Sequence, residues 1–427
     1  MNLSICVGRR RIWYHGIVEM FTIKPMPKNK RPAPRKSAVA AEEDDDVMAQ
    51  ALAELALYIV EPEEDDAADL RQKELELSHL VRNALRKKND EVLYGAIERA
   101  KYTDLAAFQH LRAHIEEASA TMVIRRDGKP AEAINAFLVP MFVHSRGGLK
   151  LEQSFQDVSA FEMLRASFQQ ARLESPDATV VLISHAYDLG EIDGISFSQL
   201  GDMLREVAAT MSEKRMVETP ALAASTSGWS GASFEPGDDA MELRFLLGFA
   251  RTREDDPFYQ APEDEAEADA YYAARLERYR QWSLEATPLL QSCLATDPSS
   301  LSINFLYQDL FYGAKEDAMA ELAMLAMMSG ITRALDEHQL DAGQVSAVVA
   351  PADVDDQMVL RVNLYRDGAG EPLASPEMPF DMAADLQTEV DDICDALGMI
   401  GIHAVSVALK YGLDGQPIEV RPYNPAL

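Results

Sequence analysis

Cysteine is scarce in this chain: Cys6, Cys293 and Cys394 are the only three among 427 residues. They are odd in number and far apart, so they indicate neither a disulfide framework nor the paired spacing of a zinc site. We therefore expect a protein of the reducing cytoplasm that holds no structural metal. No complete cofactor motif is present in the sequence, and we expect no cofactor.

Long apolar runs are also missing. The longest one, around Leu322–Ile331, falls well short of the roughly 20 residues that a membrane span needs, and it lies between Glu321 and Arg333. It is typical of a core helix. The run Arg9–Arg11 stands where a signal peptide would need its apolar segment. We expect neither a membrane span nor a signal peptide, and Met20 and Met26 are further candidate start positions.

Basic residues are few: 40 Lys and Arg stand against 71 Asp and Glu, for a net charge of −31. Residues 1–36 hold nine basic residues and one acidic residue, which leaves a charge of −39 for the rest of the chain. A body this acidic repels the phosphates of nucleic acid. We expect nucleic-acid binding only through the basic residues 24–36, and a protein partner is the alternative.

The N-terminal third changes from a polar tail to a helical pattern. Residues 1–46 pass from basic and Pro-rich to the acidic run Glu42–Asp46, with almost nothing to bury, and we predict a disordered tail. Residues 47–118 show apolar positions three and four apart throughout, which predicts a helical bundle. The apolar positions are Met48, Leu52, Leu55, Leu70, Leu77, Val81, Leu85, Val92, Ile97, Leu105, Phe108, Leu111 and Ile115.

Two stretches share one plan, which indicates an internal duplication. In Ala133–Asp188, an apolar strand, an amphipathic helix and a short buried strand follow one another, and Ser302–Asp355 repeats that order. The second stretch continues with a strand, a helix and a strand, so its order is that of a ferredoxin-like unit. We predict an α+β protein in which the helical bundle precedes two related ferredoxin-like (βαββα-type) halves. The halves span residues 119–300, with an insertion at 186–239, and residues 301–427.

Three segments form a recognisable series: the Leu/Ala-rich segment Met48–Tyr58, the strand Phe137–Pro140 that ends near Arg146, and the helix Ala318–Leu335 that leads to Ser346–Val349. In these segments the chain resembles an uncharacterised bacterial family, domain of unknown function 2863. The resemblance covers roughly residues 47–411, and its motifs are hydrophobic patterns. The family pattern has an aromatic residue near the position of His144, which speaks against catalysis by that histidine.

One set of polar residues lies at predicted strand ends. If the two strands of the first stretch are parallel, their carboxyl ends lie at one edge of the sheet, where ligands of α/β folds often bind. His144 and Arg146 follow one strand, and His185 and Asp188 follow the other. Two imidazoles, a guanidinium and a carboxylate can bind an anion or a metal ion, or transfer protons. Polar strand ends in contact with solvent are the structural alternative.

Other groups give weaker signals. His110 and His114 lie four residues apart on a helix, but Leu111 stands where a metalloprotease helix has its Glu. Ser145–Gly148 is too short for a phosphate loop. Acidic clusters such as Asp391–Asp395 are typical of a solvated surface in so acidic a chain. We assign no metal site.

Two functions follow from these observations. The first is a cytoplasmic binding or scaffold protein without catalytic activity. The second is an enzyme, or a sensor of a small anion or metal ion, that uses the strand-end site of His144, Arg146, His185 and Asp188.

Overall fold

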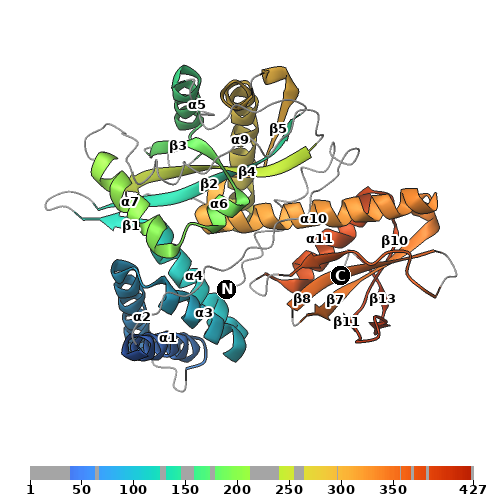
Figure 1. Ribbon diagram of the computed structural model, residues 1–427, viewed down its shortest axis with the longest axis horizontal. Helices are drawn as coiled ribbons and strands as arrows, with labels where there is room; N and C mark the ends of the chain where they lie inside the picture. Colours follow the sequence, from blue (N-terminus) through green and yellow to red (C-terminus); the bar gives the residue numbers. More distant parts are fainter. Residues whose placement is uncertain are drawn as a thin grey trace. The chain divides into compact units, whose positions relative to one another are not determined.

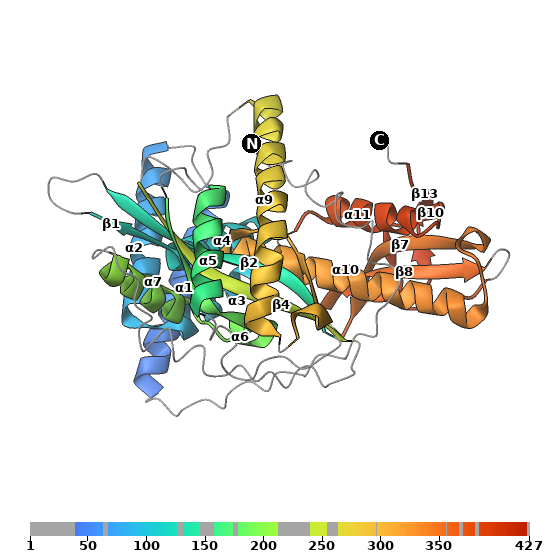
Figure 2. The same cartoon turned by 90° about the horizontal axis from the view of Figure 1, so that it is seen from above.

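The computed structural model describes residues 39–62, 67–125, 131–145, 158–173, 178–211, 240–253, 264–295, 297–355, 357–366, 370–380 and 384–424. These residues form two compact units (Figures 1 and 2). The N-terminal unit ends at Ala318, and the C-terminal unit begins at Met319. The protein is a mixed α/β protein in which antiparallel strand pairs predominate.

The N-terminal unit contains most of the helices. They are α1 (Val39–Val60), α2 (Ala67–Lys87), α3 (Asp90–Thr103), α4 (Leu105–Ala120), α5 (Val158–Ala171), α6 (Leu189–Asp193), α7 (Phe197–Met211), α9 (Glu265–Leu294) and the 3₁₀ helix η3 (Pro298–Ser300). Its strands are β1 (Thr121–Ile124), β2 (Glu132–Ser145), β3 (Thr179–Asp188), β4 (Ala240–Arg253), β5 (Leu301–Phe305) and β6 (Asp309–Leu310).

The sheet of the N-terminal unit has the strand order β1-β2-β4-β3, and β5 and β6 also pair with β2. β2 and β4 are antiparallel along their whole length, from Glu132 opposite Arg253 to Ser145 opposite Ala240. β3 is antiparallel to β4 as well. β2 and β3 therefore run in the same direction, with β4 between them.

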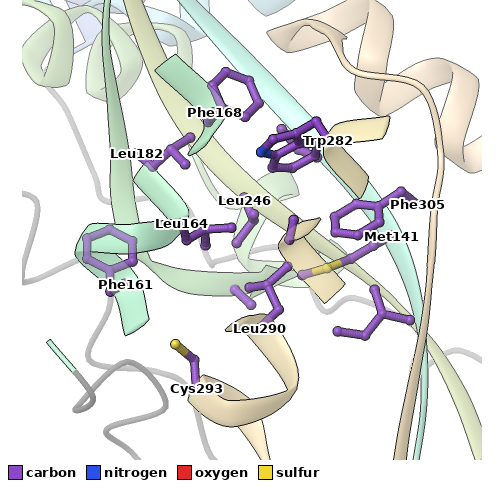
Figure 3. Close-up of a cluster of buried hydrophobic side chains, with 14 of the residues drawn as sticks. Met141, Phe161, Leu164, Phe168, Leu182, Leu246, Trp282, Leu290, Cys293 and Phe305 are labelled. Carbon is purple, nitrogen blue, oxygen red and sulfur yellow. The ribbon is translucent and has the colours of Figure 1, made fainter. Parts of the chain in front are cut away.

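Both faces of this sheet are covered. On one face, α5 and α9 bury a cluster that includes Phe168, Leu246 and Trp282 (Figure 3). α6 packs against β3 and β4, while α7 packs against β1 and β2. Neighbouring residues of β2 such as Phe137 and Leu138, which point to opposite faces, are both fully buried. The near-continuous apolar run of β2 is the pattern of a strand buried on two sides.

One glycine is needed for the packing of this sheet. Gly248 of β4 pairs with Phe137 of β2, and the phenyl ring of Phe137 lies directly over the Gly248 backbone. A Cβ atom at residue 248 would overlap that ring. Gly248 thus allows two central strands to bury a large aromatic side chain between the sheet and the helices.

The carboxylate of Asp90 joins α3 to α7, a helix that packs against the sheet. α1 packs against α3 and α4, and α4 packs against α7 and β1. Asp90, in the first turn of α3, accepts hydrogen bonds from the Ser198 backbone N–H at 2.9 Å and from the Ser198 and Ser196 hydroxyls at 2.7 and 2.6 Å. The α7 N-terminus therefore receives its capping carboxylate from another helix.

The boundary between the units falls inside α10 (Phe311–His338). The further elements of the C-terminal unit are η4 (Ala342–Gln344), β7 (Val345–Val354), β8 (Gln357–Arg366), β9 (Glu377–Pro379), α11 (Leu386–Met399), β10 (Ala404–Val407), β11 (Lys410–Tyr411), β12 (Pro417–Ile418) and β13 (Arg421–Pro422). The sheet order is β13-β10-β7-β8-β9, and β11 and β12 form a separate hairpin.

The two faces of the C-terminal sheet differ in their cover. Residues of α10 and α11 pack against one face in a cluster that includes Ile331, Val349, Leu360 and Ile393. On the other face, Val348, Ala350, Ala352 and Val359 form a small cluster with one aromatic residue of the hairpin, Tyr411.

The prediction of a ferredoxin-like arrangement is wrong for the second half, residues 301–427. Its expected first strand is β5, which pairs with β2 of the N-terminal unit. β10 pairs in parallel with β7. In the first half, β4 lies between the two strands that flank α5. The two stretches with similar sequence patterns therefore enter different sheet arrangements, because pairing partners depend on strands far away in the chain.

Two boundaries also differ from the predictions. α1 begins at Val39, inside the segment predicted to be a disordered tail, and residues 1–38 lie outside the described residues. The helical and loop insertion predicted at 186–239 begins inside β3, which continues to Asp188, and its described residues include α6 and α7. Residues 212–239 lie outside the described part of the chain.

Candidate functional site

The strand ends that carry His144 and Asp188 do not converge. His144 pairs with Met241 of β4, whereas Asp188 pairs with Arg244 of the same strand. β4 separates the two strands, so the two residues lie roughly 10 Å apart across the sheet and about 10 Å apart along it. Positions three apart on β4 also face opposite sides of the sheet.

His144 lies at the pairing of β2 with β5. Its register partner on β5 is Ser302, whose hydroxyl oxygen lies 3.4 Å from the His144 Nδ1 atom. The imidazole is half-buried. Arg146, the second residue predicted for this strand end, lies outside the described residues. The structure therefore does not bring His144 together with His185 or Asp188.

His185 lies in a buried position near the end of β3. The strand is irregular between Leu182 and Ala186, which displaces its pairing with β4. The His185 Nε2 atom lies 3.1 and 3.2 Å from the two carboxylate oxygens of Glu191 in α6. The ring of Tyr187 packs edge-on against the imidazole, with 4.5 Å between ring centroids. His185 therefore joins the end of β3 to α6.

Asp188 and Glu191 form a capping box at the start of α6. The Glu191 backbone N–H donates to Asp188 Oδ1 at 2.8 Å, and the Asp188 backbone N–H donates to Glu191 Oε2 at 2.9 Å. Two backbone donors of the helix start are satisfied in this way. The Asp-x-x-Glu spacing of residues 188–191 is a sequence signal that could have added Glu191 to the predicted site.

Arg244 completes this group, which we call the β3–α6 corner: His185, Asp188, Glu191, Glu242 and Arg244. The Arg244 guanidinium is buried, 2.5 Å from a Glu242 carboxylate oxygen and 3.8 Å from an Asp188 oxygen. Arg244 was not among the predicted site residues, because apolar residues alternate with Glu242 and Arg244 in this segment, which is typical of a strand with one face in water. The helices α5 and α9 cover that face.

The charges of the corner are unbalanced. Partial burial alone would raise the pKa of the Glu191 carboxyl group, but the hydrogen bond to His185 and the one from the Asp188 backbone N–H outweigh it, so the pKa is lowered. Glu191 thus stays ionised beside the imidazole. Three carboxylates surround one guanidinium and one imidazole, so the corner can hold a proton and favours a cationic ligand over an anionic one.

His110 and His114 have structural partners instead of a shared ligand. The His110 Nε2 atom lies 3.4 Å from Glu74, and the His114 Nε2 atom lies 3.1 Å from the Ser78 hydroxyl oxygen. Burial lowers the pKa of His114. The two residues tie α4 to α2. Among the residues that the structure describes, no group of three His, Cys, Asp or Glu side chains is placed to hold a metal ion.

An exposed apolar surface is the second candidate site. It consists of Leu409, Leu413, Ile418 and Val420, in and beside the β11–β12 hairpin, and we call it the hairpin surface. Leu413 is fully exposed, and the exposed fraction of Leu409 is 60%. The Asp414-Gly415 dipeptide is a turn signal, but no sequence pattern indicates that the flanking aliphatic residues stay outside a core.

One described helix, α10, is long and apolar enough in length and composition to cross a membrane. This is weak evidence, because a core helix of a soluble protein passes the same test. Met324, Met327 and Ile331 of α10 are buried in the core of the C-terminal unit.

A comparison with protein families gives one match. The family described as "Protein of unknown function (DUF2863)" matches residues 43–370. No curated protein and no solved structure matches the chain. The match covers more than half of the chain and confirms the predicted resemblance, so the chain belongs to this family. It includes the β3–α6 corner and ends before the hairpin surface.

Proposed function

We propose that this member of the DUF2863 family is a cytoplasmic binding or scaffold protein without catalytic activity, and that its hairpin surface binds a protein partner. The main support for this proposal is that four exposed aliphatic side chains lie within twelve residues, Leu409–Val420. Single exposed apolar residues are ordinary, but a group of them marks an interaction site.

A buried residue, Tyr411, anchors the hairpin to the sheet and so holds Ile418 outward. The Tyr411 hydroxyl donates to the Val348 carbonyl oxygen at 2.7 Å and accepts from the Asn363 backbone N–H at 3.2 Å. Tyr411 pairs with Pro417, and Lys410 pairs with Ile418. Since Tyr411 points to the sheet, Lys410 and Ile418 point away from it.

The charge of the chain favours a protein over nucleic acid as the partner. Its net charge of −31 opposes binding to nucleic acid, except through the basic residues 24–36. We also propose that this chain itself has no membrane span and binds no cofactor. The packing of α1 on α3 and α4 supports a helical bundle over residues 47–118 as a unit of the scaffold.

Site-specific crosslinking tests the proposal. A photoreactive phenylalanine replaces Leu413, and the matched control replaces Leu284 of α9, which is also a largely exposed leucine, with an exposed fraction of 70%. After irradiation of cells that produce the protein, we expect one defined crosslinked protein at residue 413 and none at residue 284. The same products at both positions, or none at either, would contradict a binding role for the hairpin surface.

A second candidate function rests on the β3–α6 corner. The buried His185 beside the ionised Glu191 supports a ligand or proton-linked site, now without His144. Glu191→Gln keeps the size of the side chain and removes its charge. We expect a divalent or organic cation to raise the melting temperature of the wild type but not of this variant. If no cation changes the melting temperature of the wild type, this function is discarded.

A further inference from the structure

We infer that the partner of the hairpin surface is a second copy of this chain, and that two hairpin surfaces meet about a two-fold axis. The inference rests on the proposed function, because it requires that this surface binds protein. It adds the identity of the partner and the symmetry of the contact.

The local charge of the hairpin favours a second copy as the partner. Between Leu409 and Pro422 the chain has two basic residues, Lys410 and Arg421, and two acidic residues, Asp414 and Glu419. All four are exposed. This segment is therefore neutral in a chain whose net charge is −31. Two copies repel each other through surfaces that carry the excess negative charge, and a neutral surface is where that repulsion is smallest.

The distribution of charges also fits a two-fold contact. A two-fold interface brings the same surface of both copies together, so the surface must be complementary to itself. Equal numbers of both charges around an aliphatic centre meet this condition, because the basic residues of one copy can approach the acidic residues of the other. A strongly basic or acidic partner would instead be matched by a rim of the opposite charge.

The small size of the hairpin is a further reason to expect a contact. β11 and β12 pair over only two residues each, and Tyr411 is the hairpin residue buried in the small cluster on the sheet. A two-stranded hairpin gains little stability alone. Ile418 faces away from the sheet, and the Leu409 backbone N–H donates to the Ile418 carbonyl oxygen at 2.9 Å, which fixes the backbone of Leu409 beside that of Ile418. Contact with a second hairpin would remove these side chains from water.

Sedimentation velocity of the full chain tests the inference over a range of protein concentrations. We expect a dimer for the wild type and for Leu284→Glu, which places the same charge on an exposed leucine elsewhere. Leu413→Glu should weaken the dimer at least tenfold, because it places a carboxylate in the apolar centre of the contact. Leu413 is fully exposed, so this substitution leaves the fold unchanged, and circular dichroism checks this.

A charge exchange tests the symmetry. Lys410→Glu/Arg421→Glu and Asp414→Lys/Glu419→Lys should each weaken self-association, and an equimolar mixture of the two variants should restore a dimer. A wild type that stays monomeric at every concentration, or a Leu413→Glu variant that dimerises like the wild type, overturns the inference. If the wild type is monomeric but residue 413 still crosslinks to a different protein, the binding role stands and only the second copy is excluded.

Discussion

The two sheets of this protein are covered in different ways. In the N-terminal unit, β2 and β4 pair over their full length and are buried on both faces, with large side chains such as Phe137, Phe142 and Phe249. In the C-terminal unit, α10 and α11 cover one face, while small residues such as Ala350 and Ala352 lie under Tyr411 on the other. The first sheet therefore has a large core on both faces. The second sheet has only a small cluster on one of its faces, and the hairpin on that face stays exposed.

The largest expected effect comes from removing the centre of the thick core. Trp282 of α9 is buried and packs edge-on against Phe168, with 4.9 Å between ring centroids. Trp282→Ala should lower the free energy of unfolding by about 3–5 kcal/mol, because it deletes buried contacts and leaves a cavity. Urea denaturation measures it. The exposed Leu284→Ala should change stability by less than about 0.5 kcal/mol, and equal losses would contradict the assigned burial.

Adding a side-chain atom to the same core tests the packing in the opposite way from the removal of Trp282. Gly248→Ala places a methyl group against the Phe137 ring, so the strands or the ring must shift, at a cost of about 1–3 kcal/mol. Gly343→Ala is the control, because nothing lies within 4 Å of the added Cβ atom there. Thermal denaturation of both variants gives the comparison. A neutral Gly248→Ala would mean that the ring does not lie over this glycine.

The thin cover of the second sheet depends on the Tyr411 hydroxyl. Tyr411→Phe leaves the buried Val348 carbonyl and Asn363 N–H without that partner, at a cost of about 1–3 kcal/mol. We also expect faster amide hydrogen exchange in the hairpin. Tyr102→Phe, at a tyrosine with an exposed fraction of 84%, should change neither quantity. Unchanged exchange in Tyr411→Phe would show that the hairpin is held by other contacts.

The smallest effect is expected at the β3–α6 corner and depends on pH. The pKa of Glu191 is lowered from 4.5 in the folded protein, so its charge contributes stability above that pH. The contribution is lost as the pH falls through the folded pKa. Glu191→Gln should destabilise the protein by about 1 kcal/mol at neutral pH, and this difference should shrink below pH 4.5. A constant difference across that range would contradict an ionised Glu191 carboxylate beside His185, and Glu277→Gln is the exposed control.

The local order of elements was readable along the chain, but their neighbours in space were not. The strand–helix–strand pattern around residues 133–188 corresponds to β2, α5 and β3. β2 and β3 do run in the same direction. β4, which comes about fifty residues after β3, inserts between them and separates His144 from His185. No local pattern states which distant strand fills such a gap.

Two further differences have the same origin. From the sequence, Pro288 predicts the end of a helix, because proline lacks the N–H that the helix needs. α9 continues through Pro288 to Leu294, since Leu290, Cys293 and Leu294 are buried in the core beyond it. Apolar residues alternate with Glu242 and Arg244 along β4, which is typical of a strand with one exposed face. In the structure, Leu246 and Ala250 on that face lie in the cluster with α5 and α9, and Arg244 is buried as well.

The sequence by itself determined the family, the acidic charge, the type of most elements and the capping spacing at residues 188–191, because these depend on composition and on periods of a few residues. Only the tertiary structure decided which strands pair, which polar residues meet at the β3–α6 corner and which aliphatic residues stay exposed on the hairpin. Strand pairing and exposure depend on which distant elements of the chain pack against a residue, and local periodicity does not indicate those elements.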